Sequence, residues 1–524
     1  MFRFYSLPVE LQTMVLNFIF EDTIPSSWDF APKCDLPPYA CVNKHWNDFF
    51  ESKTFRTLSI CPNDIKSLAT IVTPRRRAYL KHLWLRIPLT SQPCSINLEP
   101  DCPGMYKLLN QNFTMSAVAL WNVISTWNQQ KGMTLELSAS SACYSDCFID
   151  NEARLYKEYL SSGQLDQYDE EEDIYERYNC VHNAVSECVD FPSSEVRDRV
   201  WTKIVDRLFG TKPLKFTNER MLRVGHEWEL PPVTAVSKFL IRRQQFHGIC
   251  PTALNTILSS LEGIEDIHIE RWRCPGSFKE KIWCQKAQIP FARELPRSTK
   301  SLSLYGETNT VIHQWESKGT NVISFAKALR QYTNFLEHLS ISHMVDAREF
   351  FRPFSSANEE ATSSLREWPN LKTISLTSDV FKTGTEEEIT RLLCTVARAA
   401  RKMPKLQMLQ LWNGEAERAC VFRYRVEDTV GEITWCGTDI ESLTHGVVKE
   451  WNAVSVCLNR TDAREFVVPV KKEDIASTGQ VLTYLSNKDQ IMHPASAYRV
   501  IGKDQGQETG IKAKSRHMEV LRCH

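Results

Sequence analysis

A short motif of alternating apolar residues recurs along this chain at a nearly constant interval. Each copy reads apolar-x-apolar, usually with another apolar residue three positions earlier, as in IEDIHI (264–269) and LEHLSI (336–341). The central apolar residues of five successive copies are 35, 37, 35 and 35 residues apart: Ile267, Leu302, Leu339, Ile374 and Leu409. An interval held over five copies predicts a repeated strand-containing unit.

A helix is predicted before several of these strands, at PTALNTILSSL (251–261), NVISFAKALRQY (321–332) and EEEITRLLCTVARAARKM (386–403). A strand joined to a helix at a fixed period cannot bury its apolar face alone, so neighbouring units must stack to close a core. The expected fold is therefore α/β: a parallel sheet with outer helices, in an irregular leucine-rich-repeat-like solenoid. Because the period exceeds the usual repeat of about 20–29 residues, we expect a large helical side.

Less regular copies of the motif precede this region, at FRTLSI (55–60), LKHLWL (80–85) and TLEL (134–137). After residue 411 the pattern changes to a predicted β-hairpin across EDTVG and then a helix, which we expect to form an α+β cap. The predicted organisation is an N-terminal helical motif (1–54), first repeat-like units (55–137), a polar and acidic insertion with a helix (138–230), regular units of period about 35 (231–415), a hairpin and helix region (416–502) and a disordered tail (503–524).

Charge and cysteine usage limit the classes of protein to consider. The 63 Lys and Arg residues balance 64 Asp and Glu residues, so no net field draws the chain to nucleic acid or membrane. The apolar N-terminus contains Glu10 and lacks a small-residue cleavage site, so it does not read as a signal peptide. The 17 cysteines lack framework spacing and indicate reduced thiols in the cytoplasm, the nucleus or both.

The first 50 residues contain two amphipathic segments. LPVELQTMVLNFIF (7–20) places Leu7, Leu11, Val15 and Phe18 on one face of a predicted helix. A loop rich in Pro, Asp and Ser (21–38) leads to YACVNKHWNDFF (39–50), which also has helical spacing.

These two segments resemble the F-box, which opens with Leu-Pro-x-Glu and an apolar helix and closes with Val, polar residues and Trp. The matching residues are Leu7, Pro8, Glu10, Leu11, Val15, Val42, Asn43, Lys44 and Trp46. The resemblance implies a three-helix unit that binds a Skp-type adaptor and, through it, cullin and RING subunits. It implies an adaptor-binding role for Leu7, Pro8, Glu10, Leu11, Val15, Val42 and Trp46. The 21–38 connection is longer than the turn usual in the family, which leaves the middle helix open, and the apolar face could instead cap the repeat stack.

The downstream body is similar to a fungal family of F-box-associated proteins whose function is uncharacterised. The similar stretches are LPPVTAVSKFLIRRQ (230–244), EHLSISHMVDAREFF (337–351), WPNLKTISLTS (368–378), ACVFRYRV (419–426) and ITWCG (433–437). Together the two resemblances imply a substrate-receptor subunit of an SCF-type cullin-RING ubiquitin ligase, with no catalysis and no cofactor of its own. The alternatives are a repeat scaffold that acts without ubiquitination and an enzyme with an unrecognised pocket.

Strand alternation predicts a second interaction surface. If Leu83 and Leu85 point inward, the intervening side chains point away from the helices. This logic places Trp84, Arg86, His268, Tyr305 and Trp412 on one side of the sheet, together with Glu136, Glu270, Ser303 and Gln410. Aromatic and Arg side chains suit recognition of a protein substrate, unless the hairpin or the insertion covers this face.

Other motifs favour simpler interpretations. Cys143, Cys147, Cys180, His182 and Cys188 could ligate zinc, but their spacing matches no standard site, and we predict no metal. The basic run Arg75, Arg76 and Arg77 could contact phosphate, although the simpler interpretation is a solvent-exposed helix end. The acidic run DEEED (169–173) fits a solvent-exposed stretch of charge. The chain lacks G-x-S-x-G, P-loop, G-x-G-x-x-G and H-E-x-x-H motifs.

Overall fold

The computed structural model describes residues 4, 7–22, 36–89, 103–127, 132–140, 210, 212–217, 229–243, 245–274, 276–307, 323–356, 367–428, 430–438, 442–475 and 477–502. The zinc candidates, the DEEED run, most of the 138–230 insertion and the 503–524 tail lie outside these residues. None of the helices within the described ranges is long and apolar enough to cross a membrane.

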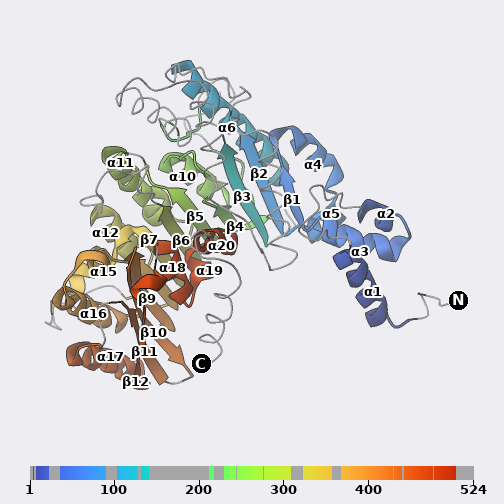
Figure 1. The fold of residues 1–524 in the computed structure, drawn as a ribbon. Coiled ribbons are helices and arrows are strands. Elements are labelled where there is room, and N and C mark those ends of the chain that lie inside the picture. Colours follow the sequence, from blue (N-terminus) through green and yellow to red (C-terminus); the bar gives the residue numbers. More distant parts are fainter. Residues whose placement is uncertain are drawn as a thin grey trace, which may run out of the picture.

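One twisted sheet organises the molecule, with its strands in the same order as in the sequence (Figure 1). The strands are β1 (Thr57–Ile60), β2 (His82–Pro88), β3 (Met133–Ser140), β4 (Val236–Ile241), β5 (Asp266–Trp272), β6 (Ser301–Glu307), β7 (His338–Asp346), β8 (Thr373–Thr377), β9 (Met408–Glu415), β10 (Arg418–Glu427), β11 (Val430–Gly437) and β12 (Thr461–Pro469). Neighbouring strands are parallel from β1 to β9, antiparallel from β9 to β11, and parallel again between β11 and β12.

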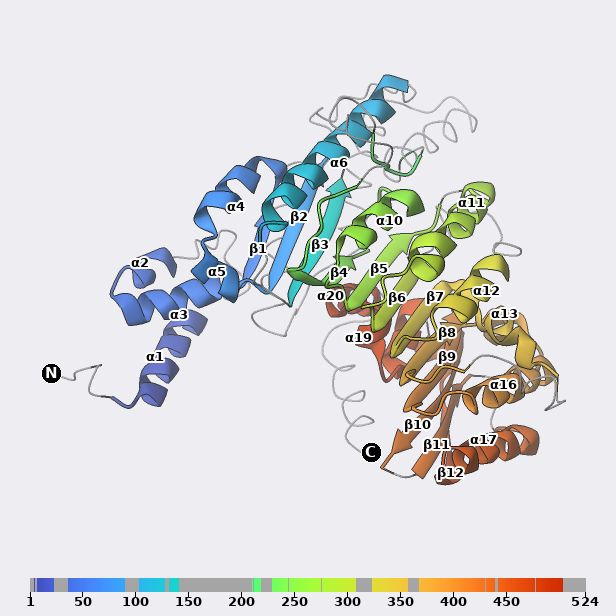
Figure 2. The same ribbon diagram turned by 180° about the vertical axis from the view of Figure 1, so that it is seen from behind.

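Most of the helices of the body cover one side of this sheet (Figure 2). The helices of the body are α4 (Ile65–Ile71), α5 (Pro74–Tyr79), α6 (Pro103–Ile124), α10 (Pro251–Ser260), α11 (Ser277–Gln288), α12 (Ile323–Tyr332), α13 (Ala347–Phe351), α15 (Val380–Thr383), α16 (Glu386–Ala400) and α17 (His445–Cys457). Shorter helical turns lie at Pro62–Asp64, Ile289–Arg293 and Arg352–Phe354. The strongest start signal is at α16, where Thr385 and Glu388 form a capping box.

The predicted register is confirmed residue by residue. Ile267 pairs with Leu302, Leu302 with Leu339, Leu339 with Ile374, and Ile374 with Leu409. These side chains are at most 1% exposed and belong to the large core between sheet and helices. The α/β class with a mostly parallel sheet is therefore confirmed, and so is the hairpin, which extends the same sheet as β10 and β11.

In the described part of the N-terminal region, three helices precede β1: α1 (Val9–Asp22), α2 (Leu36–Ala40) and α3 (Lys44–Thr54). The sequence left open whether a middle helix follows the long 21–38 connection. The structure has a helix of five residues there, α2. Helix α3 is joined to the body through α5, because Arg76 Nε donates to Glu51 Oε1 at 3.1 Å and Arg75 pairs with Asp48. Arg75 and Arg76 of the basic run therefore link α3 to α5, the helix that precedes β2.

The chain ends, within the described residues, in a piece that returns across the sheet. We call Val470 to Gly502 the C-terminal segment; it contains α18 (Thr478–Val481), α19 (Lys488–Ile491), α20 (Pro494–Gly502) and helical turns at Lys472–Asp474 and Leu482–Tyr484. It lies on the sheet side opposite the body helices, which we call the polar face (Figures 1 and 2).

The core ladder generates a stability prediction. Leu339→Ala should lower the free energy of unfolding by about 2–5 kcal/mol, because the side chain is fully buried and its loss leaves a cavity. Chemical denaturation measures this loss. The matched control is Leu108→Ala in α6, where the leucine is 45% exposed and we expect a change within about 0.5 kcal/mol. Similar small changes in both variants would contradict the proposed packing.

Candidate functional site

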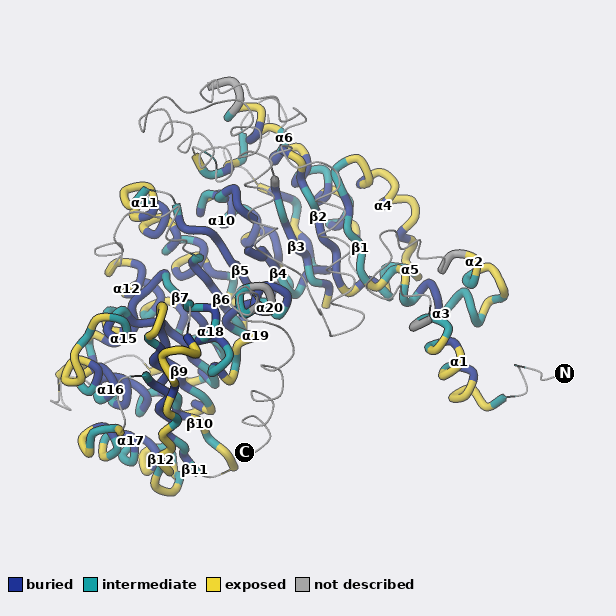
Figure 3. Tube along the Cα trace, viewed as in Figure 1, coloured by how far each residue is buried: buried dark blue, intermediate teal, exposed yellow. Residues whose placement is uncertain are grey.

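Helix α1 presents an exposed stripe of large apolar side chains. Leu11, Met14, Val15 and Phe18 are 43%, 64%, 39% and 70% exposed, at the spacing that places them on one helix face. Val42, just before α3, is 55% exposed. Figure 3 shows exposed residues along α1, in contrast to the largely buried central strands of the sheet. We call Leu11, Met14, Val15 and Phe18 the α1 stripe, whereas Val42 lies on the turn between α2 and α3.

The opposite side of α1 holds the three N-terminal helices together. Leu16 and Phe50 are fully buried and form a small core of their own, separate from the core of the sheet. Trp46 is half-buried against Phe50, with ring centroids 5.8 Å apart. Asn43 caps α3 by accepting a hydrogen bond from the Trp46 backbone N–H at 3.1 Å.

The predicted adaptor-binding residues divide by exposure. Pro8, Glu10, Leu11, Val15 and Val42 are exposed, whereas Leu7 and Trp46 are half-buried. The structure thus places most of the set at the surface. Met14 and Phe18 belong to the same stripe, and of the two only Phe18 was placed on this helix face from the sequence.

The polar face carries the second predicted set of site residues. Alternation is confirmed: in one row across the sheet, Trp84 pairs with Glu136 and His268 with Ser303, while the flanking leucines and isoleucines face the helices. The expected exposure is wrong, because Trp84, His268, Tyr305 and Trp412 are at most 3% exposed. Of the five predicted substrate-binding residues, only Arg86 is half-buried rather than buried.

The cover over much of this face is the C-terminal segment rather than the predicted hairpin. Tyr305 and Trp412 belong to a second apolar cluster together with Val481, Leu482, Ile491 and Met492 of that segment. All four segment residues are fully buried. Trp84 is covered differently, since the guanidinium carbons of Arg86 and Arg242 lie 5.5 and 4.9 Å from its ring centroid.

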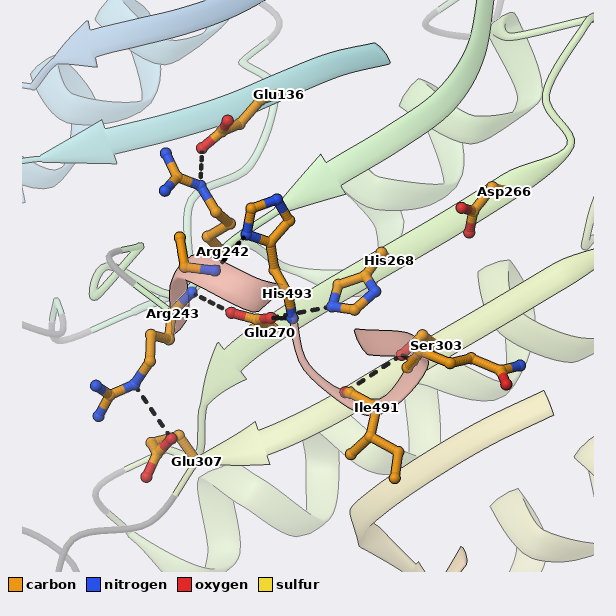
Figure 4. Close-up of polar contacts among 12 residues, drawn as sticks. Glu136, Arg242, Arg243, Asp266, His268, Glu270, Ser303, Glu307, Ile491 and His493 are labelled. Atoms are coloured by element: carbon orange, nitrogen blue, oxygen red, sulfur yellow. Dashed lines mark hydrogen bonds and ion pairs between the residues drawn. The ribbon is translucent and has the colours of Figure 1, made fainter. Parts of the chain in front are cut away.

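Glu270 is the centre of the polar contacts between sheet and segment (Figure 4). Its buried carboxylate accepts hydrogen bonds from the Arg243 backbone N–H at 2.9 Å, from His268 Nε2 at 3.0 Å and from the His493 backbone N–H. Burial alone would raise the pKa of Glu270, but the hydrogen bond and charge of His268, with the hydrogen bond from the His493 N–H, leave the pKa below its ordinary value of 4.5. The carboxylate is therefore ionised near neutral pH.

Two further ion pairs lie near Glu270, one with a buried carboxylate on β3 and one with a half-buried carboxylate on β6. Glu136 accepts from Arg242 Nε at 2.6 Å and lies 2.9 Å from His82 Nε2. Burial would raise the pKa of Glu136, but the charges of Arg242 and His82 and the hydrogen bonds with both side chains together outweigh burial, and the pKa is lowered. Arg243 Nε lies 3.3 Å from Glu307 Oε2. Each buried carboxylate thus has a cationic or hydrogen-bonding partner, which is the usual condition for burying charge.

Hydrogen bonds from further strands hold the rest of the segment. Ser303 Oγ donates to the Gln490 carbonyl at 2.6 Å, and Thr373 Oγ1 donates to Gln490 Oε1 at 2.9 Å. Gln410 Nε2 donates to Asn487 Oδ1 at 2.8 Å, and Thr478 Oγ1 donates to the Gly414 carbonyl at 2.8 Å. Side chains of β5, β6, β8 and β9 therefore contact one continuous stretch of chain.

The sequence contained a partial signal for this arrangement. Glu270 was placed on the correct side of its strand, but its partner His493 was not singled out. A charged residue between the aliphatic residues of a buried strand indicates a polar contact on that face, although it does not identify the partner. Within the described ranges, no group of three or more His, Cys, Asp or Glu residues could hold a metal ion.

Glu270→Gln should lower the free energy of unfolding by about 1–3 kcal/mol at pH 7, because one carboxylate oxygen becomes a donor facing N–H groups. The folded-state pKa is lowered, so the contribution of Glu270 is present above about pH 4.5 and is lost as the pH falls through the folded value. The wild type should therefore lose stability below about pH 4.5 that the variant does not lose. Urea unfolding across this pH range measures both effects.

The control for this prediction is Glu265→Gln, since the Glu265 side chain is 52% exposed and pairs with Lys300 at the surface. We expect its stability to change by no more than about 1 kcal/mol. An identical pH dependence in the wild type and in Glu270→Gln would contradict the role given to Glu270.

The comparisons with known proteins bear on the second half of the chain. A family model described as "Family of unknown function (DUF6546)" matches residues 294–493. The match includes β6 to β12 and the C-terminal segment as far as His493, and it does not reach the N-terminal helices. No curated protein matches the chain. The chain is therefore similar, over residues 294–493, to a family whose function is unknown.

Proposed function

We propose that this protein is the substrate-receptor subunit of an SCF-type cullin-RING ubiquitin ligase. The N-terminal helices would act as an F-box that binds a Skp-type adaptor, and the body would act as an irregular leucine-rich-repeat-like solenoid that holds a protein substrate. The observation that carries the proposal is the α1 stripe, which is apolar and exposed on a helix that keeps its own small core.

The stripe fits a protein partner better than it fits a cap for the sheet. Its four side chains are 39–70% exposed, whereas the residues that hold α1 to its neighbours lie on its other side. A contiguous exposed apolar patch on a soluble helix marks an interaction site. The order of Leu-Pro-x-Glu and Val-x-x-x-Trp in the sequence favours an F-box partner in particular.

The attachment of α3 supports a role in positioning. Arg75 and Arg76 on α5 pair with Asp48 and Glu51 on α3, and Glu51 is only 9% exposed. A partner bound at the α1 stripe would then be held in a defined orientation relative to the sheet. A ligase receptor works by such positioning, since holding a substrate near the conjugating enzyme raises its effective concentration. In this proposal the chain supplies no catalytic residue and needs no cofactor.

The full-length chain should bind a purified Skp-type adaptor. The double variant Leu11→Ala and Val15→Ala should raise the dissociation constant by about tenfold or more, because it loses side chains that the interface would bury. Both residues are exposed in the free protein, so the variant should remain folded. Titration calorimetry measures the affinity, and thermal unfolding checks the fold.

The matched control replaces two exposed apolar residues of another helix, Leu108→Ala and Met115→Ala in α6, which are 45% and 49% exposed. This control should bind the adaptor as the wild type does. An adaptor that binds the double variant at α1 with unchanged affinity would contradict the F-box proposal. A chain that captures a partner but no adaptor would favour the scaffold alternative.

A further inference from the structure

The sheet holds the C-terminal segment through contacts to its backbone, as it would hold a bound peptide. Ser303 donates to the Gln490 carbonyl, Glu270 accepts from the His493 N–H, and the Glu417 N–H donates to the Ile475 carbonyl at 2.7 Å. The segment itself forms no strand and no helix longer than the nine residues of α20. Its conformation therefore depends on the face beneath it.

The strand pairs of the sheet do not include the segment. Within the described residues it follows β12, which is the last strand in both the sequence and the sheet. Its contacts with Glu270 and Ser303 are made across 223 and 187 residues of sequence, so they are tertiary contacts that no strand pairing requires.

The fit between the segment and the face is incomplete. The hydroxyls of Ser340, Ser342 and Ser375 are buried and find no hydrogen-bond partner in the described part of the chain, and neither does Gln490 Nε2. The serines lie on β7 and β8, next to Ser303 and Thr373, which do bond the segment. Each unmatched buried group works against the closed state. Opposing this are the four fully buried apolar side chains Val481, Leu482, Ile491 and Met492.

We propose that the C-terminal segment covers the polar face and opens as a unit while the sheet stays folded. Its opening exposes the face to a substrate polypeptide. The proposal rests on the substrate-receptor function inferred above. The polypeptide that replaces the segment would carry aliphatic or Met anchors, as the segment does. It would also offer backbone amide and carbonyl groups within reach of Ser340 and Ser375.

Two buried thiols on adjacent strands allow the opening to be measured in the full-length chain. Cys436 on β11 lies in the apolar cluster under the segment, whereas Cys420 on β10 lies in the core that faces the helices. Their exposed fractions are 5% and 1%. Under native conditions iodoacetamide should label Cys436 at least about tenfold faster than Cys420, because only the segment must open. Mass spectrometry of the labelled peptides gives both rates.

Ser303→Ala removes one anchor of the segment and should raise the labelling rate of Cys436 about fivefold to tenfold, with the rate at Cys420 unchanged. The matched control is Ser260→Ala, which removes a serine whose Oγ accepts from Trp121 Nε1 at 2.7 Å on the helical side. This control should leave the ratio of the two rates unchanged.

Equal rates at Cys436 and Cys420 in the wild type, or a rise at both thiols in Ser303→Ala, would show that the segment opens only with the whole protein and would overturn the proposal. These rates are measured without an adaptor. A failure of adaptor binding would therefore contradict the receptor function, and with it the exposure of the face to a substrate, but not the opening of the segment. Equal labelling rates would contradict the opening of the segment alone.

Discussion

The rest of the structure depends on one row of side chains between the sheet and its helices. From β2 to β9 the row contains Leu83, Leu135, Phe239, Ile267, Leu302, Leu339, Ile374 and Leu409, all at most 1% exposed. Each side chain packs on the equivalent residues of the neighbouring strands, so the pairing register of one strand fixes that of the next. A slip by one residue would turn the whole row of a strand toward the polar face.

The same alternation determines the chemistry of the polar face. Residues between the aliphatic positions include Glu136, His268, Ser303, Ser340 and Gln410, and all of them are buried. Buried charges and hydroxyls require partners, so an apolar cover alone would be unfavourable. The C-terminal segment combines apolar anchors with backbone groups, which suits it to this mixed surface. Removing these charges from water offsets much of the attraction within the ion pairs, whereas the loss of one partner would leave an unpaired buried charge.

The sequence predicted the parts of the fold that follow from local periodicity. The strands around Ile267 to Leu409 and their register, the helices at α10, α12 and α16, and the β10–β11 hairpin all follow from apolar spacing and turn residues. Two strands were missed. β4 (VSKFLI) is largely buried but lies outside the regular interval. β12 (TDAREFVVP) carries charges and Pro and has no buried residue, so it lacks the pattern of a buried strand.

The candidate site was predicted in part for the same reason. Exposure of Leu11, Val15 and Val42 follows from a helix with more apolar surface than its small core can bury. Burial of Tyr305 and Trp412 could not be foreseen, because α18 and α19 have four residues each and show no usable periodicity. Which face such a segment covers is decided by contacts across long stretches of sequence, and spacing within the segment carries no information about them.

The strand order has a consequence for how the protein is made. Because the strands are arranged in the order in which a ribosome releases them, each unit can dock on the one completed before it. The strand contacts formed in this way join consecutive units of the chain, which favours rapid folding. The C-terminal segment is the exception, because it must wait for β12 and then close contacts across as many as 223 residues. A nascent chain therefore passes through a stage in which the sheet is assembled and its polar face, with Glu270 and Ser303, is still exposed to other polypeptides or to chaperones.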